Sequence, residues 1–144
     1  MRMDMFFSLL KKVRIREAMK SGVITVGLES TVHEVLKSLT ENHVSGLVVV
    51  DEFGETWGVI SSIDVIAALK DKSVEEINGL TAEDIMTPQA IEIGPEKTLE
   101  DAARVMAEKG IHRLVIGHPH EGRRVPVGII TATDIIRELK KEMS

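Results

Sequence analysis

Two short stretches of the chain repeat one arrangement of polar residues. Each places a hydroxyl three residues after a glycine and a carboxylate three residues further on: Ser61 and Asp64 in GVISSID, and Thr131 and Asp134 in GIITATD. Such a pair can cap the N-terminus of a helix as a capping box. It can also bind a ligand, because a hydroxyl can contact a phosphate or sugar and a carboxylate can accept both hydroxyl protons of a ribose. The residues alone leave both interpretations open.

The sequence around the two pairs indicates how a ligand could bind there. Each pair follows a glycine inside a strand that runs directly into a helix, so backbone amides and the positive end of the helix dipole face outward. A carboxylate there repels phosphate unless cations lie nearby. The second half of the chain offers His112 and Arg113 at positions that hold Ser45 and Gly46 in the first half. The alternative is that His112 and Arg113 are ordinary polar residues at the start of a surface strand.

The whole chain is a tandem duplication. Residues 15–50 align without a gap with residues 82–117, and residues 58–70 align with residues 128–140. Each copy reads as strand, helix, strand, strand, helix, beginning with the apolar strands 23–26 and 90–93. A unit of this size buries little apolar surface alone, so we expect an α/β (α+β) fold in which two β-α-β-β-α repeats pack as one pseudo-two-fold module.

Four segments follow from this pattern. Residues 1–13 carry apolar side chains at helical spacing and predict an amphipathic helix that docks on the body or on a partner subunit. A helix lying on a membrane surface is the weaker alternative, because its polar face holds few basic residues. Residues 14–70 form the first repeat, 71–80 a linker and 81–144 the second repeat.

Composition excludes several classes of function. The 144 residues carry a net charge of −5 and only four aromatic side chains, which argues against a nucleic-acid binder. The absence of cysteine excludes disulfides and fits a cytoplasmic protein, and no signal peptide or membrane segment is expected. The five histidines are scattered, and only His118 and His120 suggest a metal site, in a loop. We therefore expect no catalysis and no metal.

The motifs together resemble a known family. DIMTP at 84–88, HVSGLVVVD at 43–51, GIHRLVI at 110–116 and the duplicated glycine, hydroxyl and carboxylate stretch occur in the order found in a pair of cystathionine-β-synthase (CBS) domains, also called a Bateman module. The resemblance covers about residues 14–140. Proteins of this family bind AMP, ADP, ATP or S-adenosylmethionine in clefts between the paired domains.

The resemblance implies a role for particular residues. Ribose or phosphate contacts fall on Ser61, Asp64, Thr131, Thr133 and Asp134. Phosphate contacts fall on His112 and Arg113, and an adenine pocket is implied at Ile24, Val59, Ile91 and Ile129. The first repeat has Ile63 where the second has Thr133, so the two clefts are not expected to be equivalent.

The expected function is that of a stand-alone regulatory module. An adenosine nucleotide (AMP, ADP or ATP) would bind as regulatory ligand, with no other cofactor, and would change the arrangement of the repeats or subunits. The family also implies a homodimer and an unknown regulated protein acting in trans. Two alternatives remain: a dimerisation or interaction scaffold without ligand, and a sensor of S-adenosylmethionine.

Overall fold

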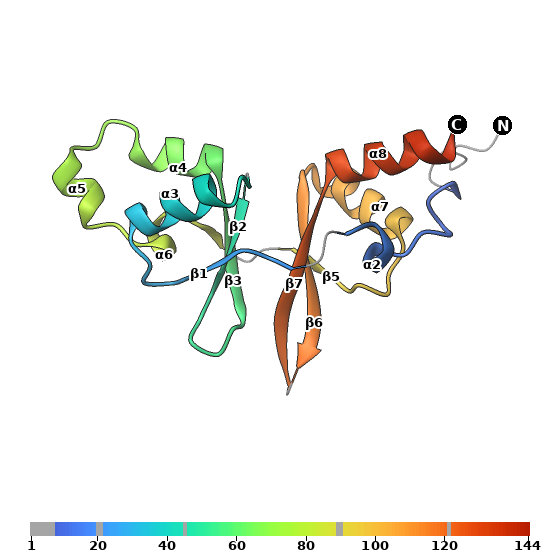
Figure 1. Ribbon diagram of the computed structural model, residues 1–144, viewed down its shortest axis with the longest axis horizontal. Coiled ribbons are helices and arrows are strands. Elements are labelled where there is room, and N and C mark those ends of the chain that lie inside the picture. Colours follow the sequence, from blue (N-terminus) through green and yellow to red (C-terminus); the bar gives the residue numbers. More distant parts are fainter. Residues whose placement is uncertain (1–7, 20–21, 45, 89–90, 121) are drawn as a thin grey trace. The chain divides into compact units, whose positions relative to one another are not determined.

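The computed structural model describes residues 8–19, 22–44, 46–88, 91–120 and 122–144. They separate into two compact units, shown in Figure 1. The first-repeat unit comprises Val23–Ala90 and Gly122–Val125, and the second-repeat unit comprises Met1–Gly22, Ile91–Glu121 and Pro126–Ser144. Each unit contains its own small sheet and its own hydrophobic core.

The first-repeat unit is built on a four-stranded sheet in the order β1-β2-β3-β4. β1 pairs in parallel with β2, whereas β3 is antiparallel to both β2 and β4. Its helices lie on one face of the sheet (Figure 1). The strands are β1 (Thr25–Gly27), β2 (Gly46–Val50), β3 (Thr56–Ser61) and β4 (Thr87–Pro88), and the helices are α3 (Val32–Glu41), α4 (Ser62–Leu69), α5 (Val74–Asn78) and α6 (Ala82–Ile85).

The pattern of apolar residues explains this packing. In α3, Val32, Val35 and Leu39 recur at helical spacing and are buried, while a capping box at Thr31 begins the helix. In β2, Leu47 and Val49 alternate toward the same core. The helices therefore cover one face of the sheet with aliphatic side chains.

The second-repeat unit repeats the plan with a three-stranded sheet in the order β5-β6-β7. Its helix α7 ends at Gly110, which adopts a left-handed conformation with φ 64°, as expected for a C-terminal glycine. The strands are β5 (Glu92–Ile93), β6 (Arg113–His120) and β7 (Arg123–Thr131), and the helices are α2 (Ile15–Ala18), α7 (Leu99–Lys109) and α8 (Ala132–Glu142). Residues 118–120 and 123–124 lie in β6 and β7, whereas a loop was expected around His118 and His120.

Each unit contains the short helix that begins the other sequence repeat: α6 lies in the first-repeat unit and α2 in the second-repeat unit. In the first-repeat unit, Ala82 N–H donates to Ser30 O at 2.8 Å. In the second-repeat unit, Ile15 N–H donates to Lys97 O, also at 2.8 Å. The two bonds join positions that are 67 residues apart in the duplication. The sequence repeats and the compact units are thus different sets of residues.

The N-terminal segment differs from the predicted helix. Residues 9–12 form turns, and residues 1–7 lie outside the described part of the chain. Leu10 is nevertheless completely buried in the core of the second-repeat unit, together with Leu99 and Met106. The segment therefore docks on the body through Leu10 without forming a helix at residues 9–12. The predicted linker at 71–80 contains the short helix α5.

The two small sheets with their covering helices confirm the predicted mixed α/β fold class.

Candidate functional site

The two hydroxyl and carboxylate pairs lie where a strand passes directly into a helix. We call residues 61–64, where β3 passes into α4, the first junction, and residues 131–134, where β7 passes into α8, the second junction. At the first junction, Asp64 N–H donates to Ser61 Oγ at 3.2 Å and Ser61 N–H donates to Asp64 Oδ2 at 2.8 Å. At the second, Thr131 and Asp134 exchange the same bonds at 3.2 and 2.9 Å. Both pairs are therefore capping boxes.

Capping uses only one oxygen of each carboxylate. Asp64 Oδ1 accepts from Thr87 Oγ1 at 3.4 Å, a long contact from β4. Asp134 Oδ1 accepts from Arg137 Nη1 at 3.1 Å, in an ion pair with a partner three residues further along α8. An ionised carboxylate has about four lone-pair positions on its two oxygens. Each junction thus holds its carboxylate in a fixed orientation and leaves acceptor capacity on Oδ1.

The glycine of the first stretch has a structural role that the sequence did not reveal. Gly58 pairs with Pro88, and a Cβ at Gly58 would lie 2.5 Å from Thr87 O and 2.9 Å from Met86 Sδ. Residues 86–88 therefore approach β3 too closely for any side chain at position 58. This approach also brings Thr87 to the first junction.

Replacing Gly58 by alanine is expected to lower the free energy of unfolding by about 1–3 kcal/mol, because the new methyl group must displace the backbone of Thr87. Urea denaturation measures the difference. Gly27→Ala is the matched control, since the nearest atom to its Cβ would be Ser30 Oγ at 3.7 Å. Equal losses in the two variants would contradict the close approach.

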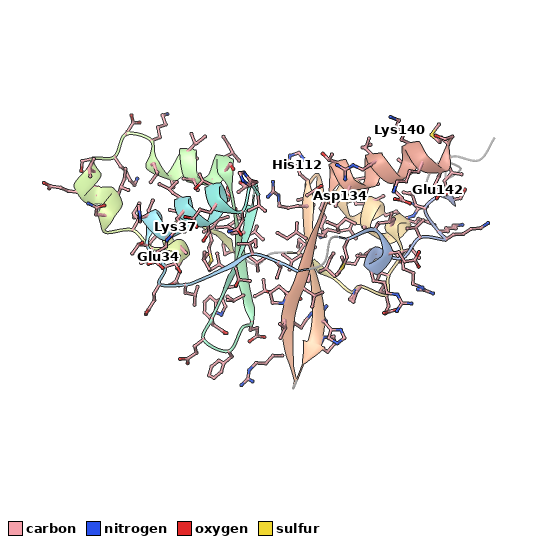
Figure 2. All side chains as sticks on the ribbon, viewed as in Figure 1. Glu34, Lys37, His112, Asp134, Lys140 and Glu142 are labelled. Atoms are coloured by element: carbon pink, nitrogen blue, oxygen red, sulfur yellow. The ribbon has the colours of Figure 1, made fainter. Side chains whose placement is uncertain are left out.

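The predicted phosphate residues begin the strand next to the second junction. Ala132 N–H donates to His112 O at 2.8 Å, so the start of β6 lies beside the start of α8. Figure 2 shows His112 and Asp134 at the same end of the second-repeat unit. Arg113 is the first residue of β6. In the first-repeat unit the corresponding Gly46 pairs with Ser61, and Ser45 lies outside the described residues.

The four residues predicted to line an adenine pocket do not all lie together in the structure. Ile24 packs against the core of the first-repeat unit, under the helices. Val59 on β3 pairs with Val48 on β2. The neighbours of these two residues along the strands, such as Ile60, point into that core, so Val59 lies on the opposite face of the sheet. Ile91 is 39% exposed, and Ile129 is partly buried beside core residue Ile130. The structure therefore does not place Ile24 and Val59 on one face.

Two contacts at the junctions were missed by sequence reasoning. Thr87 lies in the DIMTP motif, but its contact with Asp64 depends on β4 reaching β3, which no local pattern encodes. Arg137 carries a readable signal, because residues three apart on a helix are neighbours. The first repeat has Ala67 at the position that corresponds to Arg137.

A separate groove lies at the other end of β2, which we call the acidic groove. It has a volume of about 750 Å³, and its lining includes Glu29, Asp51, Phe53, Trp57 and Glu83. Carboxylates of this density disfavour phosphate. The acidic groove is thus a less favourable site for an anionic ligand than either junction.

Asp51 organises the turn beside the acidic groove. Its pKa is lowered chiefly by the indole N–H of Trp57, which donates to Oδ2 at 3.0 Å. Partial desolvation opposes this shift, and the backbone N–H groups of Glu55 and Phe53 add to it by donating to Oδ1. The ionised side chain therefore fastens the turn between β2 and β3.

Because the folded-state pKa of Asp51 is lowered, its contribution to stability is present above the ordinary aspartate pKa and is lost as the pH falls through the lowered value. We expect Trp57→Phe to reduce this acid-dependent loss of stability. Denaturation from neutral to acidic pH measures it, with Asp51→Asn as the variant in which the contribution is absent at every pH. An unchanged pH profile in Trp57→Phe would contradict the assignment.

Metal-binding clusters and membrane-spanning helices are absent from the described residues. No group of three or more metal-binding side chains is found among them, and the side chain of His120 lies outside the described part. None of the described helices has the length and apolar character needed to span a bilayer.

Comparison with known proteins decides the family. The CBS domain model matches residues 15–71 and 82–141, which is most of the chain. The chain belongs to the CBS domain family. This confirms the resemblance to a pair of CBS domains drawn from the duplicated motifs.

Solved CBS domain structures share this fold. The chain is similar to CBSX2 in complex with AMP, with 26% identity, a TM-score of 0.74 and coverage of 92% of this chain and 99% of that one. It is also similar to the CBS domain pair of protein MJ0100 in complex with 5′-methylthioadenosine and S-adenosyl-L-methionine, with 26% identity, a TM-score of 0.78 and coverage of 90% and 98%.

Relatives known by sequence are longer. The uncharacterized protein MJ1225 of Methanocaldococcus jannaschii is 34% identical over 125 residues, which is 87% of this chain and 42% of that protein. The uncharacterized protein MK0525 of Methanopyrus kandleri is 28% identical over 89% of this chain and 63% of that protein. The chain therefore spans about two fifths to two thirds of the length of these relatives.

Proposed function

We propose that this CBS domain pair is a non-catalytic regulatory module that binds an adenosine nucleotide (AMP, ADP or ATP) at its two junctions. The observation that carries the proposal is the carboxylate at each junction, which is fixed by a capping box and keeps acceptor capacity on Oδ1. The two adjacent hydroxyl groups of a ribose suit such an oriented acceptor. The CBSX2 complex with AMP supports the ligand class.

The second junction is the better phosphate site in this proposal. His112 lies beside it through the bond to Ala132 N–H, and Arg113 follows. A guanidinium binds phosphate through two parallel hydrogen bonds, which offsets the repulsion between the phosphate and Asp134. At the first junction, the residue that corresponds to Arg113 is Gly46, so phosphate gains no such contact from that position.

S-adenosylmethionine is a second candidate, favoured by the first junction. Its sulfonium is cationic and it has no phosphate, so the carboxylate of Asp64, which has no ion pair in the described part of the chain, attracts it. The complex of the MJ0100 domain pair with this ligand supports the candidate. The remaining alternative is an interaction scaffold, in which the capping boxes alone account for Asp64 and Asp134.

Titration calorimetry and thermal unfolding with AMP, ADP, ATP and S-adenosylmethionine test the proposal. A ligand at about one hundred times its Kd is expected to stabilise the fold by about 2.7 kcal/mol for each site. Stabilisation by the nucleotides supports the proposed class, and stabilisation by S-adenosylmethionine alone supports the second candidate. If none of the four ligands stabilises the chain, the proposal fails and the interaction scaffold becomes the favoured function.

A regulatory output requires that binding shift an equilibrium between arrangements of the protein. We propose that the regulated protein is a separate chain and that the module works as a homodimer. Three isoleucines on helices support self-association: Ile63 and Ile66 on α4 are 67% and 66% exposed, and Ile136 on α8 is 64% exposed. Apolar side chains of this size, grouped on a helix surface, are typical of interfaces.

Replacing Ile66 by glutamate is expected to weaken the dimer, because a buried interface cannot hold an unpaired charge without a large cost. Light scattering after size-exclusion chromatography measures the mass of the particle. Val74→Glu on α5 is the control, since Val74 is 72% exposed on a different helix. A particle of unchanged mass in the Ile66 variant would remove α4 from the interface.

A further inference from the structure

Arg137 distinguishes the two junctions. Its Nη1 donates to Asp134 Oδ1 at 3.1 Å, and its side chain is 58% exposed while that of Asp134 is 24% exposed. Thr131 N–H already donates to the other oxygen, Oδ2. Both oxygens of Asp134 therefore have a donor within the same unit, and the oxygen that the proposed function assigns to the ribose is the one bonded to a guanidinium.

The first junction lacks this arrangement. The position that corresponds to Arg137 on α4 is Ala67, and Asp64 Oδ1 has only the 3.4 Å contact with Thr87 Oγ1. The position that corresponds to Arg113 is Gly46. The second junction therefore has a guanidinium bonded to its carboxylate, whereas the corresponding position on α4 in the first junction holds no cation.

Because of this difference, the two junctions should differ in the ligand charge that they prefer. A ribose that binds Asp134 Oδ1 must compete with Arg137, and an ion pair this exposed is weak enough to exchange. A neutral nucleoside offers nothing to the guanidinium that it displaces. A phosphate offers two acceptor oxygens in the geometry that arginine prefers, so the displaced guanidinium gains a charge-assisted partner.

We propose that Arg137 makes the second junction selective for phosphorylated ribosides over neutral ones. Arg137 is a specificity-determining residue in this proposal, and the first junction, with Ala67, has no such preference. The inference rests on the proposed function, because it names the ligand charge that the second junction selects. It follows from the contact of Arg137 with Asp134 and not from the positions of His112 and Arg113.

The test compares adenosine with AMP at each junction separately. In NMR titrations of the full chain, the Thr133 amide monitors the second junction and the Ile63 amide monitors the first. Arg137→Ala is expected to tighten adenosine binding at the second junction by about two- to fivefold, because the competing ion pair is lost. AMP binding there is expected to weaken about tenfold or more, because a charge-assisted hydrogen bond is lost.

Two further variants serve as controls. Lys140→Ala removes one positive charge from the same helix, at the position labelled in Figure 2, and is expected to leave the preference for AMP over adenosine unchanged. Ala67→Arg places the guanidinium on α4 and is expected to raise the preference for AMP at the first junction. It tests the inference without altering the second junction.

The outcomes separate the inference from the function on which it rests. If neither ligand shifts either amide in the wild-type protein, the proposed function fails and the inference fails with it. If both ligands bind and the preference for AMP is the same in Arg137→Ala as in wild type, only the selectivity is wrong. An equal loss of preference in Lys140→Ala would also overturn it, because net charge would then be the cause.

Discussion

The Leu10→Ala variant is expected to have a free energy of unfolding about 2–5 kcal/mol lower than that of the wild-type protein. Leu10 has no exposed surface and packs into the core formed by α7, β6, β7 and α8. Truncation leaves a cavity that this core can fill only in part. Urea denaturation measures the loss.

The control for this variant is Leu36→Ala. Leu36 is 40% exposed on α3, so removal of its side chain leaves no closed cavity and the loss is expected to be smaller. A loss in Leu10→Ala no larger than that of the control would mean that the N-terminal segment does not belong to the core. Deletion of the segment would then be tolerated as well.

The Asp134→Asn variant is expected to bind AMP about ten- to a hundredfold more weakly at the second junction, because hydrogen bonds to a charged acceptor contribute about 1.5–3 kcal/mol. Asparagine keeps an oxygen that can accept from Thr131 N–H, so the helix cap is largely retained. Calorimetric titration with AMP measures the change, and thermal unfolding without ligand measures the stability of the cap.

Glu142→Gln is the matched control, because it removes one negative charge from the far end of α8. We expect its affinity for AMP to equal that of the wild-type protein. Weakening by the same factor in both variants would show that the effect is long-range electrostatics and would remove Asp134 from the ribose site.

The local features of the fold could be predicted from the sequence. The capping boxes at both junctions are encoded by residues three apart, and the structure contains them. The helical spacing of Val32, Val35, Leu36 and Leu39 predicts one buried stripe; Val32, Val35 and Leu39 are buried, whereas Leu36 is 40% exposed. Such features depend on neighbouring residues alone, so the sequence pattern contains the information that specifies them.

Features that depend on distant residues could not be predicted. Gly58 reads as part of a ligand motif, yet the residue is required because Met86 and Thr87 pass close to β3. Likewise, the bond from Ala82 to Ser30 joins a helix to a repeat that precedes it, and no periodicity within either repeat indicates this exchange. Leu10 was predicted on a helix and is instead buried from a turn, because packing against the core outweighs helix propensity in so short a segment.

The candidate site shows the same division. Ser61, Asp64, Thr131 and Asp134 lie at the strand-to-helix junctions that their motif predicts. Their role toward a nucleotide stays a prediction, as do the roles of Thr133 and the four apolar residues. Ile24 and Val59 illustrate the difficulty, because aligned apolar positions in a repeat do not reveal which face of the sheet each side chain occupies.

A crystal structure of the chain with AMP tests the central claim most directly. The account predicts that a ribose hydroxyl lies within hydrogen-bonding distance of Asp134 Oδ1, with the phosphate toward Arg113, and that Thr131 N–H still donates to Oδ2. AMP bound elsewhere, for instance in the acidic groove beside Trp57, would contradict the account. So would crystals grown with saturating AMP in which both junctions remain empty and the carboxylates keep only their capping contacts.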